Sequence, residues 1–173
     1  ISESTEVCIE CAPSSALSRK DWIEFFSLLT RREILPVTRI SIGAQALSAS
    51  TLTRLGRRGG LRALMSIIEA VDNSVDAYNV DLLIGLPDSV TGRSSVDQCD
   101  DTVAGIDALK AQGMRMPCIS LYQLWGTEQI RLLRRQRKLP DTRALLSAKL
   151  RLQDRLFERG YRPGVVSTLV SAP

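Results

Sequence analysis

The sequence YNVDLLIG, residues 78–85, decides the fold class. It is a short run of aliphatic and β-branched residues that ends at a glycine and carries one carboxylate, Asp81. Similar runs occur at 6–11 (EVCIEC), 37–43 (VTRISIG) and 117–124 (PCISLYQL). Runs of this length and composition are typical of strands that are buried on both faces of a parallel sheet. The sequence therefore predicts four parallel strands whose outer face is covered by helices.

Longer segments with helical periodicity separate and follow these runs, and capping residues mark where several of them begin. The predicted helices begin at Ser18 and at Ser48 or Ser50, and cover 61–71, about 96–112 and about 140–159. A loop is expected around Pro87, and a final short strand at 165–169. The stripe after Ser18 contains Trp22, Phe25, Phe26 and Leu29. Alternation of strands and helices indicates βαβ units, in either a barrel-like or a doubly wound arrangement.

The composition is that of one globular domain, with 173 residues, 44% hydrophobic residues and 24% charged residues. No apolar stretch approaches the roughly 18 residues that a transmembrane helix needs, so we expect a cytoplasmic protein with no membrane span. The first residue is Ile1 and a strand follows almost at once, so we expect the sequence to begin inside a longer protein. The sequence contains no histidine, which excludes a Ser-His-Asp triad or a His-ligated metal within it.

Two local features have simple structural interpretations. The basic run RLLRRQRK at 131–138 has no interleaved aromatic residues, so a solvated helix face is favoured and no nucleic-acid partner is expected. Cys8 and Cys11 form a CxxC pair inside one predicted strand. Residues three apart on a strand point to opposite faces, so these thiols are not expected to bind one metal ion. The four cysteines are expected to be reduced.

Polar residues gather at the carboxyl ends of the predicted strands, where ligands bind in parallel α/β folds. They are Glu10, Gln45, Asp81, and Tyr122 with Gln123. Because a buried carboxylate is costly without a partner, Asp81 must be paired or hydrogen-bonded. It is either a ligand-binding group or a structural carboxylate that caps a helix or pairs with an arginine.

Arg57 follows shortly after Gln45 in the LGRRGG turn. Its guanidinium has the planar geometry that binds a carboxylate through two hydrogen bonds, although a surface arginine at a helix end is the simpler interpretation. The nearby glycines at 56, 59 and 60 do not have the spacing of a phosphate-binding loop.

Four phrases together resemble one family. They are IECAP at 9–13, RISIGAQALS at 39–48 with LGR at 55–57, NVDLLIGLPDSV at 79–90, and ISLYQLW at 119–125. In this order they are similar to the strand-end motifs of the radical S-adenosylmethionine (SAM) family that includes oxygen-independent coproporphyrinogen III oxidase, haem chaperones and C-methylating or cyclopropane-forming enzymes. The resemblance implies an incomplete parallel (β/α) barrel over residues 1–173, without the first two of the family's six strands.

The resemblance also implies the site. Glu10, Gln45, Arg57 and Asp81 would contact SAM, with Arg57 holding its carboxylate and Leu83 packing on the adenine. The three closely spaced cysteines that hold the family's [4Fe-4S] cluster have no match here, so the cluster ligands are expected outside this segment. The implied activity is reductive cleavage of SAM to a 5′-deoxyadenosyl radical that acts on a porphyrinogen or a complex aromatic metabolite. Flavodoxin or ferredoxin would be the electron donor.

Two alternatives remain open at this stage. The first is a haem-binding chaperone of the same family without turnover, which the ISLYQL phrase at 119–124 resembles somewhat more closely than the decarboxylases. The second is a segment with no activity of its own, whose open first strand would aggregate or pair through its edge.

Overall fold

The structure is a computed structural model of the chain. It describes residues 7–14, 16–29, 37–57, 60–75, 77–92, 94–123, 141–164 and 168–171. The basic run at 131–138 lies outside these ranges. Within them, no helix is both long enough and apolar enough to cross a membrane.

One six-stranded sheet forms the centre of the molecule, in the order β1-β2-β3-β4-β6-β5. Its strands are β1 (Val7–Cys11), β2 (Val37–Gln45), β3 (Tyr78–Ile84), β4 (Cys118–Gln123), β5 (Tyr161–Pro163) and β6 (Thr168–Ser171). The strands β1 to β4 pair in parallel, as the sequence predicted. β6 runs antiparallel to both β4 and β5, so the sheet extends beyond the four expected strands.

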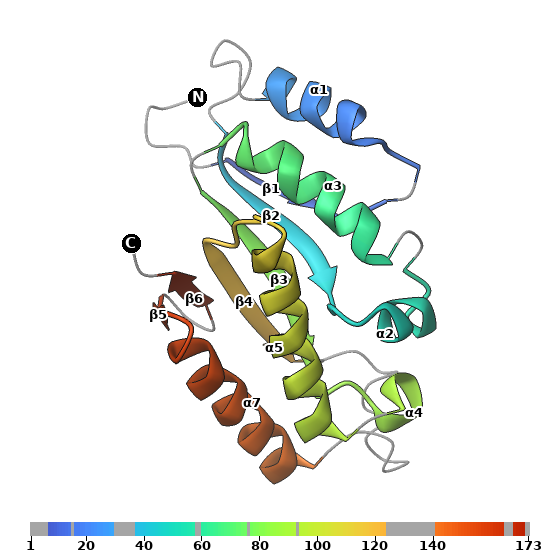
Figure 1. Cartoon of the computed structure of the whole chain (residues 1–173), viewed down its shortest axis with the longest axis vertical. Helices are drawn as coiled ribbons and strands as arrows, with labels where there is room; N and C mark the ends of the chain where they lie inside the picture. Colours follow the sequence, from blue (N-terminus) through green and yellow to red (C-terminus); the bar gives the residue numbers. More distant parts are fainter. Residues whose placement is uncertain are drawn as a thin grey trace.

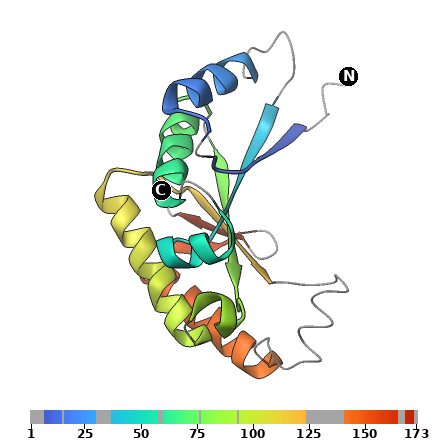
Figure 2. The ribbon, with the colours of Figure 1, turned by 90° about the vertical axis from the view of Figure 1, so that its right-hand side faces the viewer.

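The long helices all lie on one side of this sheet (Figures 1 and 2). The helices are α1 (Arg19–Leu29), α2 (Ala49–Arg54), α3 (Gly60–Asp72), α4 (Asp88–Thr91), α5 (Ser95–Ala111) and α7 (Thr142–Phe157). α1 packs beside α3, and α5 packs beside α7. An α/β fold with four parallel strands and a single layer of covering helices is thus confirmed.

The two faces of the sheet differ because side chains alternate along each strand. In β3, Val80, Leu82 and Ile84 belong to the apolar core under the helices. The intervening residues at 79, 81 and 83 therefore point to the opposite side. We call this side the open face. It also carries Glu10 of β1 and Ser120 of β4, which are the register neighbours of residues on β2 and β3.

The predicted helix starts are confirmed by their caps. Ser18 and Asp21 form a capping box, with Ser18 N–H donating to Asp21 Oδ2 at 2.7 Å and Asp21 N–H donating to Ser18 Oγ at 3.3 Å. Ser48, rather than Ser50, caps α2 by accepting from the Thr51 N–H. These hydrogen bonds satisfy N–H groups that the first turn of a helix leaves unpaired.

Three details differ from the sequence-based expectations. The segment after Pro87 contains the short helix α4 rather than only a loop. β5 precedes the final strand β6 where no strand was expected; β6 overlaps the strand expected at 165–169, of which residues 165–167 lie outside the described ranges. In α1, Trp22 and Phe26 are buried but Phe25 is 39% exposed, because one helix face cannot cover four bulky positions equally.

Gly105 of α5 lies against the chain that leaves β2. A Cβ at this position would lie 2.5 Å from Leu47 Cβ and 3.3 Å from the Leu47 carbonyl oxygen. Helix propensity alone favours Gly105→Ala by roughly 1 kcal/mol, but the clash must push α5 away from the sheet. We expect a net loss of about 1–2 kcal/mol in the free energy of unfolding, measured by urea denaturation. Ala104→Gly, on the exposed side of the same helix, calibrates the effect of helix propensity; a net gain for Gly105→Ala would contradict the close approach.

Buried hydroxyl and thiol groups make the fold sensitive to alkaline pH. Burial raises the pKa of Tyr161 to about 12 and the pKa of Cys99 to about 11, and it also raises the pKa of Tyr78. The unfolded chain releases these protons near pH 8.5 for a thiol and about 10 for a phenol, before the folded chain does. The stability they contribute is therefore complete below about pH 8.5 and is lost as the pH rises toward 12.

Urea denaturation between pH 7 and pH 11 measures this loss. We expect the urea midpoint to fall above about pH 9, and to fall less steeply in Tyr161→Phe, which has no phenolic proton to lose. A midpoint that stays constant up to pH 11 would show that these groups titrate at ordinary values.

Candidate functional site

The carboxylate of Asp81 lies in the middle of β3 and points to the open face. Its two oxygens have different partners: the Ser41 hydroxyl on β2 donates to Oδ2 at 2.6 Å, and the Asn79 side-chain amide donates to Oδ1. Asp81 is only half-buried, so part of the group faces solvent. Its partners are neutral donors rather than the helix N–H groups or the arginine of a structural carboxylate.

The hydrogen bonds continue from Asp81 across three strands. The Asn79 amide nitrogen also donates to Ser41 Oγ at 3.2 Å. The Ser120 hydroxyl on β4 donates to the Asn79 Oδ1 at 2.9 Å. These three partners are buried, with 6% of Ser41, 2% of Asn79 and 2% of Ser120 exposed. We call Ser41, Asn79, Asp81 and Ser120 the polar network.

Charged groups on neighbouring strands act on this network. The pKa of Asp81 is raised, chiefly by burial and further by the negative charge of Glu10. The hydrogen bonds from Ser41 and Asn79, and the positive charge of Arg39, oppose that rise in the pKa. Burial also raises the pKa of the thiol at 118, and the charge of Arg39 opposes this rise as well. Groups from β1, β2, β3 and β4 therefore face the same space above the sheet.

Gln45 ends β2 in an unusual backbone conformation with φ of 68°. Its side chain folds back over Gly43, because a Cβ built on Gly43 would lie 2.9 Å from Gln45 Nε2 and 3.6 Å from the Cys11 carbonyl oxygen. Glycine at 43 thus leaves the space that the Gln45 amide occupies. The register shift between Ile42 and Gln45 accompanies this turn of the chain. The amide of Gln45 therefore lies over β2, close to the end of β1.

Glu10 is exposed on β1, where it is the register partner of Ser41. Since β2 separates β1 from β3, and Asp81 lies two residues beyond the register neighbour Asn79, the backbones of Glu10 and Asp81 lie about 12 Å apart. The structure thus brings Glu10, Gln45 and Asp81 to one face of the sheet.

Arg57 lies in the chain after α2 and is exposed. Its backbone N–H donates to the Leu52 carbonyl at 2.9 Å. In the described part of the chain, its guanidinium makes no hydrogen bond or ion pair with Glu10, Gln45 or Asp81. Its contact with a ligand on the open face therefore stays a prediction.

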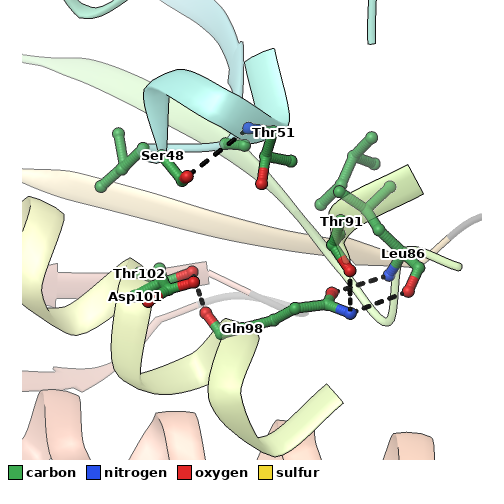
Figure 3. A pocket seen from close by; sticks show the side chains of 10 residues that line it. Ser48, Thr51, Leu86, Thr91, Gln98, Asp101 and Thr102 are labelled. Carbon is green, nitrogen blue, oxygen red and sulfur yellow. Dashed lines mark hydrogen bonds between the residues drawn. The ribbon is translucent and has the colours of Figure 1, made fainter. Parts of the chain in front are cut away.

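Leu83, the fifth predicted residue, lines a small cavity at the carboxyl ends of β2 and β3. The cavity volume of about 20 Å³ has room for one water molecule and not for a nucleoside. Beside it, the Gln98 amide accepts from the Leu86 N–H at 3.1 Å and donates to the Leu86 carbonyl at 2.9 Å (Figure 3). Gln98 therefore fixes the segment that follows β3.

A second hollow of about 600 Å³ lies on the outside of the molecule, between α5 and α7. Its lining includes Val96, Leu150 and Arg151. The helices separate this groove from the open face, so it shares none of the predicted site residues.

The cysteines do not provide a cluster site. Cys8 is exposed on β1, whereas Cys11 is buried in the core. Within the described ranges, no group of three or more histidine, cysteine, aspartate or glutamate residues is arranged to hold a metal ion. The described residues therefore do not fit an iron-sulfur cluster.

Comparison with known proteins supports the fold and little beyond it. No family model and no curated protein matches the sequence. Among solved structures, the chain is similar to the radical SAM enzyme coproporphyrinogen III oxidase (HemN) from Escherichia coli, with a TM-score of 0.68. The likeness shows that the chain shares the fold of the matching part of that enzyme. The match covers 96% of this chain but 35% of HemN, at 16% sequence identity, so the chain spans about a third of that enzyme.

Sequence reasoning singled out Asp81 but missed Ser41 and Asn79, which donate to it, and Ser120, which donates to Asn79. The sequence does indicate these residues, because every second residue of a strand points to the same face of the sheet. Asn79 lies two residues before Asp81, and Ser41 and Ser120 interrupt otherwise apolar runs in RISIG and CISLY. Polar residues at matching positions of three adjacent strands indicate a shared polar face.

Proposed function

We propose that this chain is the later part of a radical SAM enzyme, with residues 1–173 forming part of its partial barrel. In this proposal the open face of the sheet binds the nucleoside portion of SAM. The observation that carries the proposal is the Asp81 carboxylate, which neutral donors from two strands hold on the open face of a radical SAM-like fold. A carboxylate held by neutral donors, and left partly exposed, remains able to accept hydrogen bonds from a ligand.

The chemistry of the donor set fits SAM. Each oxygen of Asp81 receives one hydrogen bond from the network, so each keeps a lone pair for a hydroxyl or amino group of the ligand. Glu10 offers a second carboxylate on the same face, and Gln45 offers an amide that both donates and accepts. Arg57 would pair with the carboxylate of SAM through two hydrogen bonds, and Leu83 would pack against the adenine.

The role of these residues is to bind and orient. Together with a reduced [4Fe-4S] cluster held outside this chain, SAM would supply a 5′-deoxyadenosyl radical that removes hydrogen from the substrate. We propose a porphyrinogen or a complex aromatic metabolite as the substrate, a flavodoxin or ferredoxin as the electron donor, and a cytoplasmic location. The apolar core behind the open face would keep water from one side of the reacting groups.

The test uses the longer protein to which this chain is proposed to belong. It is reconstituted with iron and sulfide, reduced, and incubated with SAM, and 5′-deoxyadenosine is measured by chromatography. We expect 5′-deoxyadenosine to form in the wild-type protein. If its iron and sulfide content corresponds to a full cluster and no 5′-deoxyadenosine forms, the proposed function is wrong.

A further inference from the structure

Asn79 uses its whole side-chain amide inside the polar network. Its nitrogen donates to Asp81 Oδ1 and to Ser41 Oγ, and its oxygen accepts from the Ser120 hydroxyl. The ionised carboxylate can only accept, so the amide nitrogen must face Asp81 and the oxygen must face Ser120. The orientation of this amide is therefore fixed by groups on both sides of it.

The four hydrogen bonds described within the polar network run toward the carboxylate. Ser120 donates to Asn79, Asn79 donates to Ser41 and to Asp81, and Ser41 donates to Asp81. Each donor that is itself polarised by another hydrogen bond donates more strongly, so the network acts as a unit. Asn79 is the member that connects β4 to β2, because it accepts from Ser120 and donates to Ser41.

We propose that Asn79, held in one orientation by Ser120, is a positioning residue that fixes the Asp81 carboxylate for the ligand on the open face. With one lone pair of each oxygen engaged by the network, the remaining lone pairs point away from the sheet as a paired acceptor. This inference rests on the proposed function, since Asp81 is the residue through which Asn79 acts.

Removing the Asn79 amide has an expected effect on the titration of Asp81. A hydrogen bond to the charged form of a carboxyl favours ionisation, so its loss raises the pKa of Asp81 by about one pH unit. Three other groups face the same space: Glu10 on β1, Arg39 on β2 and Cys118 on β4. They are the same in the wild-type protein and the variant, so they do not account for a difference between the two.

Removing the amide also has an expected effect on the ligand. A carboxylate that is free to rotate must be ordered when the ligand binds, and the cost of ordering it lowers the affinity. We expect the affinity for SAM to fall about tenfold.

The experiment compares Asn79→Ala, Ser120→Ala and Ser120→Thr with Ser95→Ala, a buried serine at the start of α5. The pH titration of the Asp81 carboxyl carbon is followed by NMR in the 173-residue chain. The SAM dissociation constant is measured with the cluster-loaded longer protein. We expect Asn79→Ala and Ser120→Ala to raise the Asp81 midpoint and weaken SAM binding. Ser120→Thr, which keeps the hydroxyl, should restore both to wild-type values, and Ser95→Ala should leave both unchanged.

A merely structural role would lower the thermal stability of the variants without moving the Asp81 midpoint, and that result would overturn the inference. If the midpoint shifts but the wild-type protein binds no SAM, the proposed function fails while the effect of Asn79 on Asp81 stands. If Asn79→Ala does not fold, the inference is tested in the wild-type chain by measuring how fast the side-chain amide protons of Asn79 exchange with solvent. Slow exchange with solvent supports the fixed orientation, and exchange as fast as that of the exposed Asn73 contradicts it.

Discussion

Replacing Asp81 with asparagine is expected to weaken SAM binding by about 10- to 100-fold, because a charged acceptor becomes a neutral amide of the same shape. Asparagine keeps one oxygen that accepts from Ser41 or Asn79, but it replaces the other acceptor with a donor. The paired acceptor on the open face is therefore lost. The dissociation constant, measured by calorimetry on the cluster-loaded longer protein, gives the size of the effect.

The same substitution is expected to preserve the stability of the chain. The pKa of Asp81 is raised in the folded state, chiefly by burial, so its ionisation opposes folding. The stability that accompanies the protonated form is present at low pH and is lost as the pH rises through the folded pKa of Asp81. The asparagine side chain carries no charge and avoids this loss, which offsets the one network hydrogen bond that its amide nitrogen cannot accept, so the free energy of unfolding of Asp81→Asn at pH 7 should stay close to the wild-type value.

The combination of weaker binding and retained stability is what separates a binding carboxylate from a structural one. Asp100→Asn is the matched control, because Asp100 on α5 forms an exposed ion pair with Arg151 at 3.1 Å, on the helix side of the sheet. Exposed pairs contribute about 0–1 kcal/mol, so this variant should bind SAM like the wild-type protein. Strong destabilisation of Asp81→Asn with unchanged SAM affinity would identify Asp81 as structural.

Replacing Tyr161 with alanine is expected to cost about 3–5 kcal/mol in the free energy of unfolding, the range for deleting a large buried aromatic side chain. Tyr161 is fully buried at the start of β5, and its hydroxyl donates to the Met116 carbonyl at 3.0 Å. The Lys110 ammonium lies 4.4 Å from the centre of its ring. This side chain therefore joins the end of α5 to the antiparallel pair β5 and β6.

Tyr161→Phe isolates the hydroxyl from the ring. It should cost only about 1–2 kcal/mol, because the ring still fills its space while the Met116 carbonyl loses its donor. Urea denaturation of both variants measures the difference. A small cost for Tyr161→Ala would mean that β5 and β6 are not anchored through this residue, and that β4 does not depend on them for its position.

Most of the fold was predictable from the sequence because its signals are local. The strand around Asp81 and the three others lie where apolar runs indicated them, and Ser18 caps α1 as predicted. The short helix α4 and the pairing of β5 with β6 were not predicted. Three or four residues carry too little periodicity to identify an element, and antiparallel pairing is decided by tertiary contacts.

The sequence predicted a site residue only where that residue type is unusual for its predicted element. Asp81 was conspicuous as a carboxylate in an apolar strand, whereas Asn79 becomes informative only when it is compared with Ser41 and Ser120 at matching positions of the neighbouring strands. The folding of Gln45 over Gly43 depends on a positive φ and a register shift, which the sequence does not signal at a glutamine. The assignment of Arg57 to SAM remains a prediction, because its exposed side chain has no described contact to the open face.

A crystal structure of the cluster-loaded longer protein with SAM tests the central claim most directly. We predict density for the nucleoside on the open face, with its polar groups within hydrogen-bonding distance of the Asp81 carboxylate and near Glu10 and Gln45. A nucleoside bound elsewhere, such as in the groove between α5 and α7, would contradict the account even if the enzyme cleaves SAM.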